Sequence, residues 1–204
     1  MPTIYDLKPK FQALLRPFCR RLAEAGVTAN QVTLIACGLS IAHGAAHLMN
    51  PGAKWVLTLL PVILFVRMAL NAIDGMLARE FGQASRLGAI LNELTDVISD
   101  AALYLPFALI PGVPALLVVI AVLFGVIAEM TGVIGVQIGA SRRYDGPFGK
   151  SDRAFFFGAL AVLLVMFDTG LWSTVLIAFA CALGAATIVN RSKMALKEVS
   201  HADT

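Results

Sequence analysis

The stretch NAIDGMLAREFGQASRLGAILNELTD, from Asn71 to Asp96, carries acids, amides and arginines at regular spacings in a chain that is otherwise apolar over long segments. An ionisable side chain at the centre of a membrane helix costs about 2.5 to 3.5 kcal/mol on insertion scales. Several such residues close together therefore call for a functional explanation, which depends on where the surrounding helices lie.

The composition identifies a membrane protein. The 204 residues are 58% hydrophobic and only 14% charged, and the mean hydropathy is +0.80. One helix needs about 20 mostly apolar residues to cross about 30 Å of hydrocarbon. Windows of this kind lie at 32–49, 55–72, 87–110, 113–138, 154–167 and 171–189. We therefore predict an all-α integral membrane protein with six transmembrane helices.

The first thirty residues have a different character. Apolar side chains recur there at near-helical spacing among basic ones, which is typical of a helix lying in the headgroup layer. We predict three regions: an N-terminal cytoplasmic amphipathic segment at 1–30, the six-helix membrane domain at 31–190 and a cytoplasmic tail at 191–204.

The basic residues predict the orientation. All of the sixteen lysines and arginines except Lys54 and Arg67 fall on one predicted side, in the terminal segments or in the connections after the second and fourth spans. Cytoplasmic loops carry such an excess, so both termini should be cytoplasmic. The net charge of +3 then reflects sidedness, and we predict no nucleic-acid partner.

The polar residues of the opening stretch form two stripes. One comprises Asn71, Asp74 and Ala78, and the other comprises Gly88, Asn92, Asp96 and Asp100. Members of each stripe are three or four residues apart, which places them on one helix face. Two antiparallel helices joined by a short loop bring such stripes face to face, and their oxygens predict a site for a hard metal ion.

Small residues beside the acids suit a phosphate ligand. Gly75 and Gly88 remove side chains and permit close approach to the backbone. Arg79, about one turn from Gly75, could pair with a phosphate oxygen or with an acid. The alternative is a set of solvated boundary residues. That explanation accounts poorly for Asp96 and Asp100, which lie inside an apolar segment.

The spacing resembles the signature of the CDP-alcohol phosphatidyltransferase family, D-x2-D-G-x2-A-R-x8-G-x3-D-x3-D. This chain reads N-x2-D-G-x2-A-R-x8-G-x3-N-x3-D, with every interval intact. The matching residues are Asp74, Gly75, Ala78, Arg79, Gly88 and Asp96. Two further stretches, VTANQVTL at 27–34 and GPFGKSDRA at 146–154, are similar to the family's entry to its first span and to the connection before its fifth.

The resemblance implies an enzyme of phospholipid biosynthesis in a bacterial inner membrane, with a cytoplasmic active site. In that family Mg²⁺ or Mn²⁺ holds the diphosphate of a lipid such as CDP-diacylglycerol, an acceptor alcohol attacks the lipid-side phosphorus, and CMP leaves. By position, Asp74 matches a metal-binding acid and Asp96 the last acid, a general base. Gly75, Ala78, Arg79 and Gly88 match positions around the nucleotide and diphosphate. The resemblance also implies a homodimer.

The chain departs from the family pattern at Asn71 and Asn92, which hold amides where the signature has its first and third acids. An amide oxygen can ligate a hard cation but brings no charge. We expect metal ligands among Asn71, Asp74, Asn92, Asp96 and Asp100. Three outcomes stay open: a single-metal enzyme, a site completed by Glu93 or Asp100, or an inactive relative that binds CDP-lipids.

The acceptor is a small alcohol, with a phosphorylated alcohol as one option. Five cytoplasmic basic residues could bind an anionic acceptor: Arg142, Arg143, Lys150, Arg153 and Arg191. Arg153 and Arg191 are the better candidates because they lie nearest to span boundaries. Simple positive-inside topology would explain the same residues.

Two further expectations concern the ionisable residues inside the spans. Arg67 and Glu129, both inside spans, are predicted to form a buried pair that fixes helix packing. A transporter that carries ions on its intramembrane acids is a third hypothesis. Transporters often show internal repeats or broken helices, and we find neither in the sequence.

Overall fold

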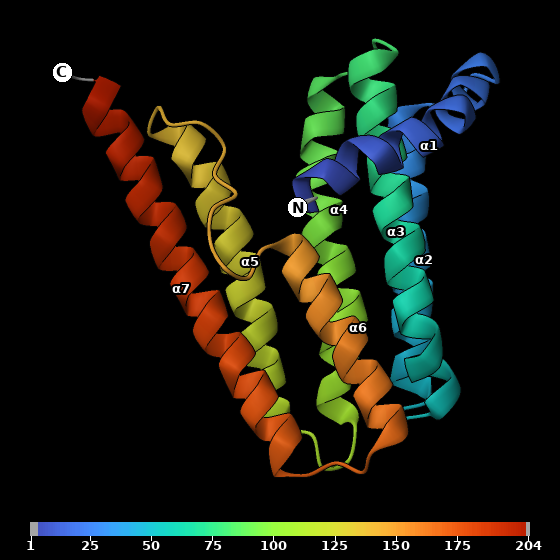
Figure 1. The fold of residues 1–204 in the computed structure, drawn as a ribbon, viewed down its shortest axis with the longest axis vertical. Coiled ribbons are helices and arrows are strands. Elements are labelled where there is room, and N and C mark those ends of the chain that lie inside the picture. The colour runs from blue at the N-terminus through green and yellow to red at the C-terminus, as the bar shows by residue number, and fades with distance from the viewer. Residues whose placement is uncertain (1–3, 203–204) are drawn as a thin grey trace. The chain divides into compact units, whose positions relative to one another are not determined.

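The computed structural model describes residues 4–202, with side chains for residues 11–200. Within this range every regular element is helical (Figure 1). The elements are α1 (Ile4–Glu24), α2 (Ala29–Met49), α3 (Lys54–Glu80), α4 (Arg86–Tyr104), the 3-10 helix η1 (Leu105–Leu109), α5 (Ala115–Gln137), α6 (Lys150–Met166) and α7 (Leu171–Ala202). The predicted all-α class is confirmed.

Each of the six predicted spans coincides with one of the helices α2 to α7. Among the described residues, α2, α3, α5 and α7 are long and apolar enough to cross a membrane. The two others are shorter, with 19 residues in α4 and 17 in α6. The protein therefore has four candidate spans by this standard, and the six-span count stays a prediction. The predicted tail, as far as Ala202, continues α7 as helix.

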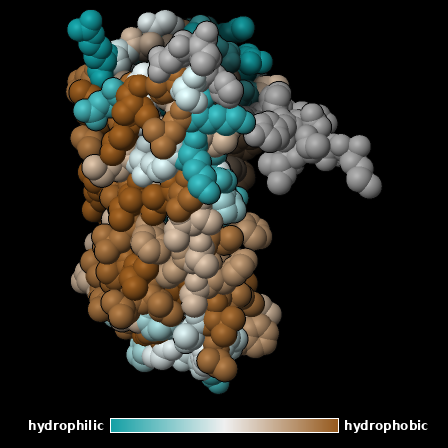
Figure 2. All heavy atoms as spheres, turned by 90° about the vertical axis from the view of Figure 1, so that its left-hand side faces the viewer, coloured by the Kyte–Doolittle hydropathy of each residue, from teal (hydrophilic) through white to brown (hydrophobic). Residues whose placement is uncertain are grey.

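The outward face of α5 and α7 is apolar. Exposed hydrophobic side chains on these helices include Leu116, Leu123, Met130, Leu171, Val175 and Phe179. On the face drawn in Figure 2, hydrophobic side chains cover the middle of the surface, and hydrophilic ones gather toward its ends. A large continuous apolar surface of this kind needs a partner other than water, and lipid is the partner that the helix lengths indicate.

The helices divide into two compact units, which are described separately. The first unit contains residues up to Ala42 together with Val62–Ser99, and the second contains His43–Pro61 together with residues from Asp100 onward. The division falls within α2, α3 and α4.

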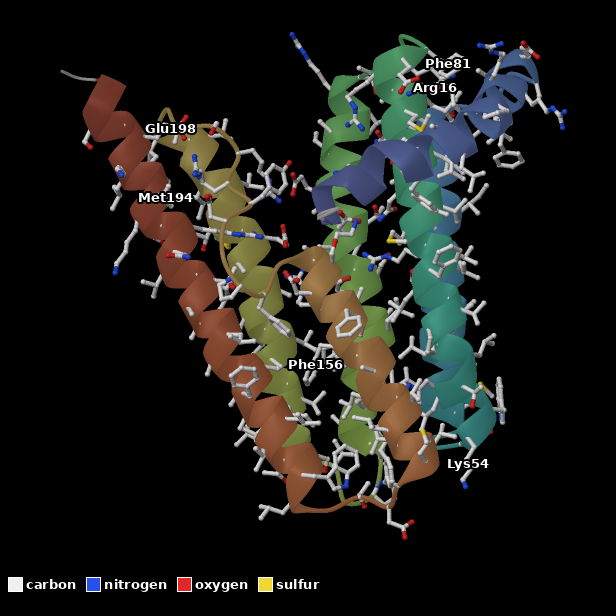
Figure 3. All side chains as sticks on the ribbon, in the orientation of Figure 1. Arg16, Lys54, Phe81, Phe156, Met194 and Glu198 are labelled. Atoms are coloured by element: carbon white, nitrogen blue, oxygen red, sulfur yellow. The ribbon has the colours of Figure 1, made fainter. Side chains whose placement is uncertain are left out.

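In the first unit, α1 packs against the C-terminal part of α3. Buried side chains from α1, α2 and α3 form one cluster, which consists of Cys19, Ala29, Val32, Ile73, Met76 and Leu77. Arg16 donates to Glu80 from Nε at 2.9 Å and from Nη2 at 3.1 Å. Figure 3 shows Arg16 beside the end of α3 that leads into Phe81. The amphipathic helix predicted from the sequence thus has one face docked on α3.

In the second unit, aromatic rings and one close helix contact form the core. The Tyr104 ring stacks on the Phe157 ring with centroids 4.1 Å apart, and Phe107 packs edge-on against Phe157 at 5.3 Å. A Cβ atom added to Gly44 of α2 would overlap the carbonyl group of Ala102 in α4 and lie 3.3 Å from its Cβ. Glycine is required at position 44 because the two backbones approach so closely.

We expect Gly44→Ala to lower the free energy of unfolding by about 1 to 3 kcal/mol, because the added methyl group forces α2 and α4 apart. Thermal unfolding of the purified protein in detergent measures the change. Gly38→Ala is the matched control, since nothing lies within 4 Å of a Cβ at that position of α2. Equal unfolding temperatures for the two variants would contradict the close contact.

Candidate functional site

One contact in the first unit joins the two helices that carry the polar stripes. Nη2 of Arg67, on α3, donates to the Asp96 carbonyl oxygen on α4 at 3.1 Å and lies 3.5 Å from Asp96 Oδ1. The Arg67 side chain is 4% exposed and that of Asp96 is 20% exposed. Arg67 precedes Asn71 by one helical turn, so it belongs to the same face as the first stripe. This contact joins α3 to α4, and the facing of the two stripes stays a prediction.

Asp74 is held by a residue that sequence reasoning missed. Its carboxylate is buried and accepts a hydrogen bond from Thr33 Oγ1 on α2 at 2.7 Å. This hydrogen bond fixes the orientation of the carboxylate. Thr33 lies within the stretch 27–34 that resembles the family's first span, and that resemblance was the available signal.

The glycines of the motif leave room for polar groups. A Cβ atom on Gly75 would lie 2.8 Å from Nη2 of Arg79, so the guanidinium of Arg79 folds back over Gly75. A Cβ on Gly88 would lie 2.8 Å from Oδ1 of Asn30, on α2. Any larger residue at position 75 or 88 would have to displace these groups. The side chain of Asn30 therefore adjoins the motif, although the sequence gave it no role.

The stripes offer donors that suit one divalent cation. Asn71 and Asp96 are half-buried, Asn92 is exposed and Asp74 is buried. Carboxylate and amide oxygens are the hard ligands that Mg²⁺ and Mn²⁺ prefer. In the part of the chain that the structure describes, no group of three or more His, Cys, Asp or Glu side chains is arranged to hold a metal. The donor set thus depends on the asparagines, and the ligand assignment stays a prediction.

The second unit contains three arginines around Glu129 of α5, two of them buried and one, Arg142, half-buried. Oε2 of Glu129 lies 2.8 Å from Nη2 of Arg142 and 3.3 Å from Nη1 of Arg191. Oε1 of Glu129 lies 3.0 Å from Nη2 of Arg153. We call Glu129, Arg142, Arg153, Arg191 and Asp100 the arginine cluster. It contains both residues predicted to bind the acceptor.

Further contacts hold the arginines of the cluster in place. Arg153 donates from Nε to Asp100 Oδ2 at 2.9 Å. Arg191 donates from Nη1 to the carbonyl oxygen of Ala128 at 2.6 Å. Arg153 and Arg191 are 3% and 1% exposed, so any ligand would reach them only from within the protein.

The expected pair between Arg67 and Glu129 stays a prediction, because the two residues lie in different units. Both residues are buried as predicted. However, Glu129 bonds arginines from the loop after α5, from α6 and from α7, while Arg67 bonds Asp96. Charge and depth in the sequence identified the two residues as buried ions but could not choose between partners of the same sign.

Two glycines of α5 provide the space for the arginines. A Cβ atom on Gly125 would lie 3.1 Å from Cδ of Arg153, and one on Gly132 would overlap the guanidinium of Arg142. Both glycines are buried. The long side chains can therefore cross α5 only because these positions have none.

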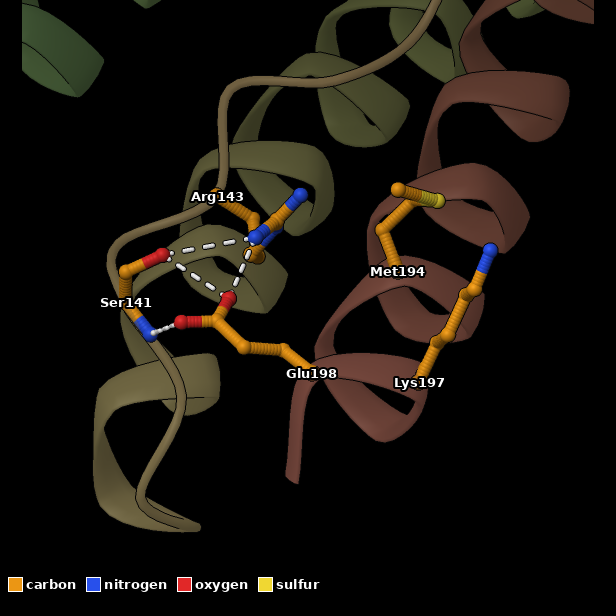
Figure 4. Close-up of a pocket in the computed structure, with 5 residues that line it drawn as sticks. All are labelled: Ser141, Arg143, Met194, Lys197 and Glu198. Atoms are coloured by element: carbon orange, nitrogen blue, oxygen red, sulfur yellow. Dashed lines mark hydrogen bonds and ion pairs between the residues drawn. The ribbon is translucent and has the colours of Figure 1, made fainter. Parts of the chain in front are cut away.

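A pocket of about 390 Å³ lies between α7 and the loop that follows α5, which contains Arg142 of the arginine cluster (Figure 4). Its lining residues are Ser141, Arg143, Met194, Lys197 and Glu198. Glu198 accepts from the Ser141 amide at 3.0 Å and also bonds Arg143. Nε of Arg143 donates to Asp145 Oδ2 at 2.8 Å, and this bond holds the pKa of the Asp145 carboxyl below its ordinary value. These contacts fix the loop to the end of α7.

Comparison with known proteins identifies relatives over nearly the whole chain. The family model described as CDP-alcohol phosphatidyltransferase matches residues 26–193. The Inner membrane protein YnbA of Escherichia coli is 46% identical over 195 residues, which cover 95% of this chain and 96% of that protein. The phosphatidylinositol phosphate synthase of Corynebacterium glutamicum is 33% identical over 101 residues, which cover 50% of this chain and 44% of that enzyme.

Solved structures share the fold. The phosphatidylinositol phosphate synthase PgsA1 of Mycobacterium tuberculosis, with CDP-DAG bound, superposes with a TM-score of 0.72 at 20% identity. The match covers 88% of this chain and 92% of that one. The same enzyme in complex with manganese and citrate also gives a TM-score of 0.72.

We expect Glu129→Gln to destabilise the protein by about 3 to 5 kcal/mol, because it leaves the buried guanidinium groups of Arg153 and Arg191 and the half-buried one of Arg142 around a neutral side chain. Thermal unfolding in detergent is the measurement. Glu198→Gln is the control, since its side chain is 39% exposed and should contribute about 1 kcal/mol or less. A Glu129 variant as stable as the Glu198 variant would show that the arginine cluster does not need its central acid.

Proposed function

The chain belongs to the CDP-alcohol phosphatidyltransferase family, and on that premise we propose that it transfers a phosphatidyl group from a CDP-diacylglycerol-type lipid to an acceptor alcohol. The observation that carries the proposal is the motif from Asp74 to Asp96, with its glycines and Arg79 at the family's intervals. The contact of Arg67 on α3 with Asp96 on α4 supports it, because these two helices carry the two halves of the motif.

In the proposed reaction, the hydroxyl oxygen of the acceptor forms a bond to the lipid-side phosphorus of the diphosphate. The bond from that phosphorus to the bridging oxygen breaks, and CMP leaves with the oxygen and the electron pair. Asp96 takes the hydroxyl proton, because an alcohol is a weak nucleophile near neutral pH until a base removes its proton. Its half-buried carboxylate is open to a substrate.

The chain's other motif residues bind and orient the donor. Asp74, fixed by Thr33, and the oxygens of Asn71, Asn92 and Asp96 would hold Mg²⁺ or Mn²⁺. When bound, the cation neutralises the charge that develops on the leaving diphosphate oxygens. Asp100, which bonds Arg153 in the second unit, is left out of this ligand set.

The residues proposed to bind the nucleotide and the diphosphate depend on close approach of the ligand to the backbone. Gly75 and Gly88 expose the backbone, with Ala78 between them as a small neighbour on the first stripe. Arg79 is exposed and folds over Gly75, from where it can donate to a phosphate oxygen. The diacyl chains of the donor would stay in lipid while its headgroup is held at these residues.

The arginine cluster favours a phosphorylated acceptor. It contains three arginines and two acids, so its formal charge is positive before any ligand binds. An anionic acceptor such as an inositol phosphate or glycerol phosphate would balance that charge. Relatives named phosphatidylinositol phosphate synthase support this acceptor class, although the chain spans less than half of the Corynebacterium enzyme. We place the enzyme in a bacterial inner membrane as a homodimer, with cytoplasmic termini and active site.

The proposal predicts CMP release from CDP-diacylglycerol with Mg²⁺ or Mn²⁺, only when an acceptor is present. Asp96→Asn should reduce the rate by about 100-fold or more, because the base is lost. Asp168→Asn is the control, since Asp168 is an exposed acid in the turn before α7. Stabilisation by CDP-diacylglycerol without CMP release from any acceptor would instead identify a CDP-lipid-binding protein, which the asparagines at 71 and 92 also fit.

The acceptor class has a separate test. With a phosphorylated acceptor, Arg153→Lys and Arg191→Lys should raise the acceptor KM by about tenfold, because an ammonium group cannot reproduce the bidentate geometry of a guanidinium. The donor KM should not change. Lys193→Gln, an exposed cation on α7, is the control. An acceptor KM that stays unchanged in both arginine variants would exclude the cluster as the acceptor site.

A further inference from the structure

Arg67 is a buried cation in the first unit that the proposed reaction does not yet use. It is 3% exposed and lies in α3, far from either end of the helix. Burying a guanidinium is unfavourable unless anions and acceptors surround it. Its contacts to the carbonyl and the carboxylate of Asp96 place this charge on the proposed base.

The asparagines change what that charge does. An acid at position 71, one turn from Arg67 on the same face, would pair with the guanidinium. The amide of Asn71 cannot neutralise it, nor can that of Asn92 on the facing helix. Compared with the family signature, the site has therefore lost two negative charges while a positive charge sits beside one of the two acids that remain.

We propose that the Arg67 guanidinium is a built-in cation of the site, standing where a second divalent cation would otherwise bind at Asp96. The site then takes up a single metal ion, for which Asp74 supplies the charged ligand; the ligand set proposed above narrows to Asp74, Asn71 and Asn92, and Asp96 keeps only its role as the base. The inference rests on the proposed function, since it assigns Arg67 a role toward the donor's diphosphate.

Two physical arguments support the replacement of a second divalent cation by the Arg67 guanidinium. A divalent ion on Asp96 would face a fixed positive charge whose Nη2 atom is 3.5 Å from Oδ1, and the repulsion is strong where water is scarce. A guanidinium also supplies directed N–H donors that match phosphate oxygens. Arg67 can thus stabilise charge on the diphosphate without a metal, as arginines do in other phosphoryl-transfer enzymes.

The test counts metal ions with Mn²⁺ alone, on the full-length protein in detergent, by calorimetric titration and by electron paramagnetic resonance. We expect one Mn²⁺ per chain in the wild type and still one in N71D/N92D, because Arg67 is retained. The triple variant R67Q/N71D/N92D should bind two. Two Mn²⁺ or none in the wild type, two in N71D/N92D, or one in the triple variant would overturn the proposal.

Two further variants address folding. Arg67→Lys keeps a charge at the same place and should still bind one Mn²⁺, whereas Arg67→Gln should lose CMP release by about 100-fold or more. Lys54→Gln is the control, because Lys54 is an exposed cation at the other end of α3 (Figure 3). Metal counting needs no turnover, so an absence of CMP release from the wild type would count against the proposed function and not against this inference.

Discussion

A charge inside an apolar helix is stable only where an opposite charge or a set of polar atoms surrounds it, and this requirement governs the packing of both units. In the first unit it draws Arg67 of α3 to Asp96 of α4. In the second it gathers arginines from the loop after α5, from α6 and from α7 around Glu129. The apolar residues allow many helix arrangements, whereas the ions accept few.

The two units use their charges differently. In the first unit, the two acids of the motif each contact a specific side chain: Thr33 bonds Asp74, and Arg67 bonds Asp96. The second unit has an excess of cations that share one carboxylate. A site of the first kind suits a metal-bound diphosphate, and one of the second kind suits an anion. The proposed division of labour between donor and acceptor follows from this contrast.

Much of the fold could be predicted because apolar length is a local property. The six windows locate helices α2 to α7, and the spacing of Asp74, Gly88 and Asp96 indicates two facing stripes. Partners far apart in sequence were harder. Thr33 bonds an acid 41 positions away, and the spacing of the motif residues does not predict that bond. The contact of Arg67 with Asp96 was not predicted either, because any buried acid satisfies the same rule and only packing decides which one lies within reach.

Gly125 and Gly132 have no side chains to contribute, yet they define the volume that Arg153 and Arg142 occupy across α5. A substitution at either glycine would close that volume before it altered any charge. Each glycine and the arginine packed against it therefore depend on one another. In the evolution of this branch, we expect them to be retained or replaced together, and a lineage that loses the arginine is free to fill the helix.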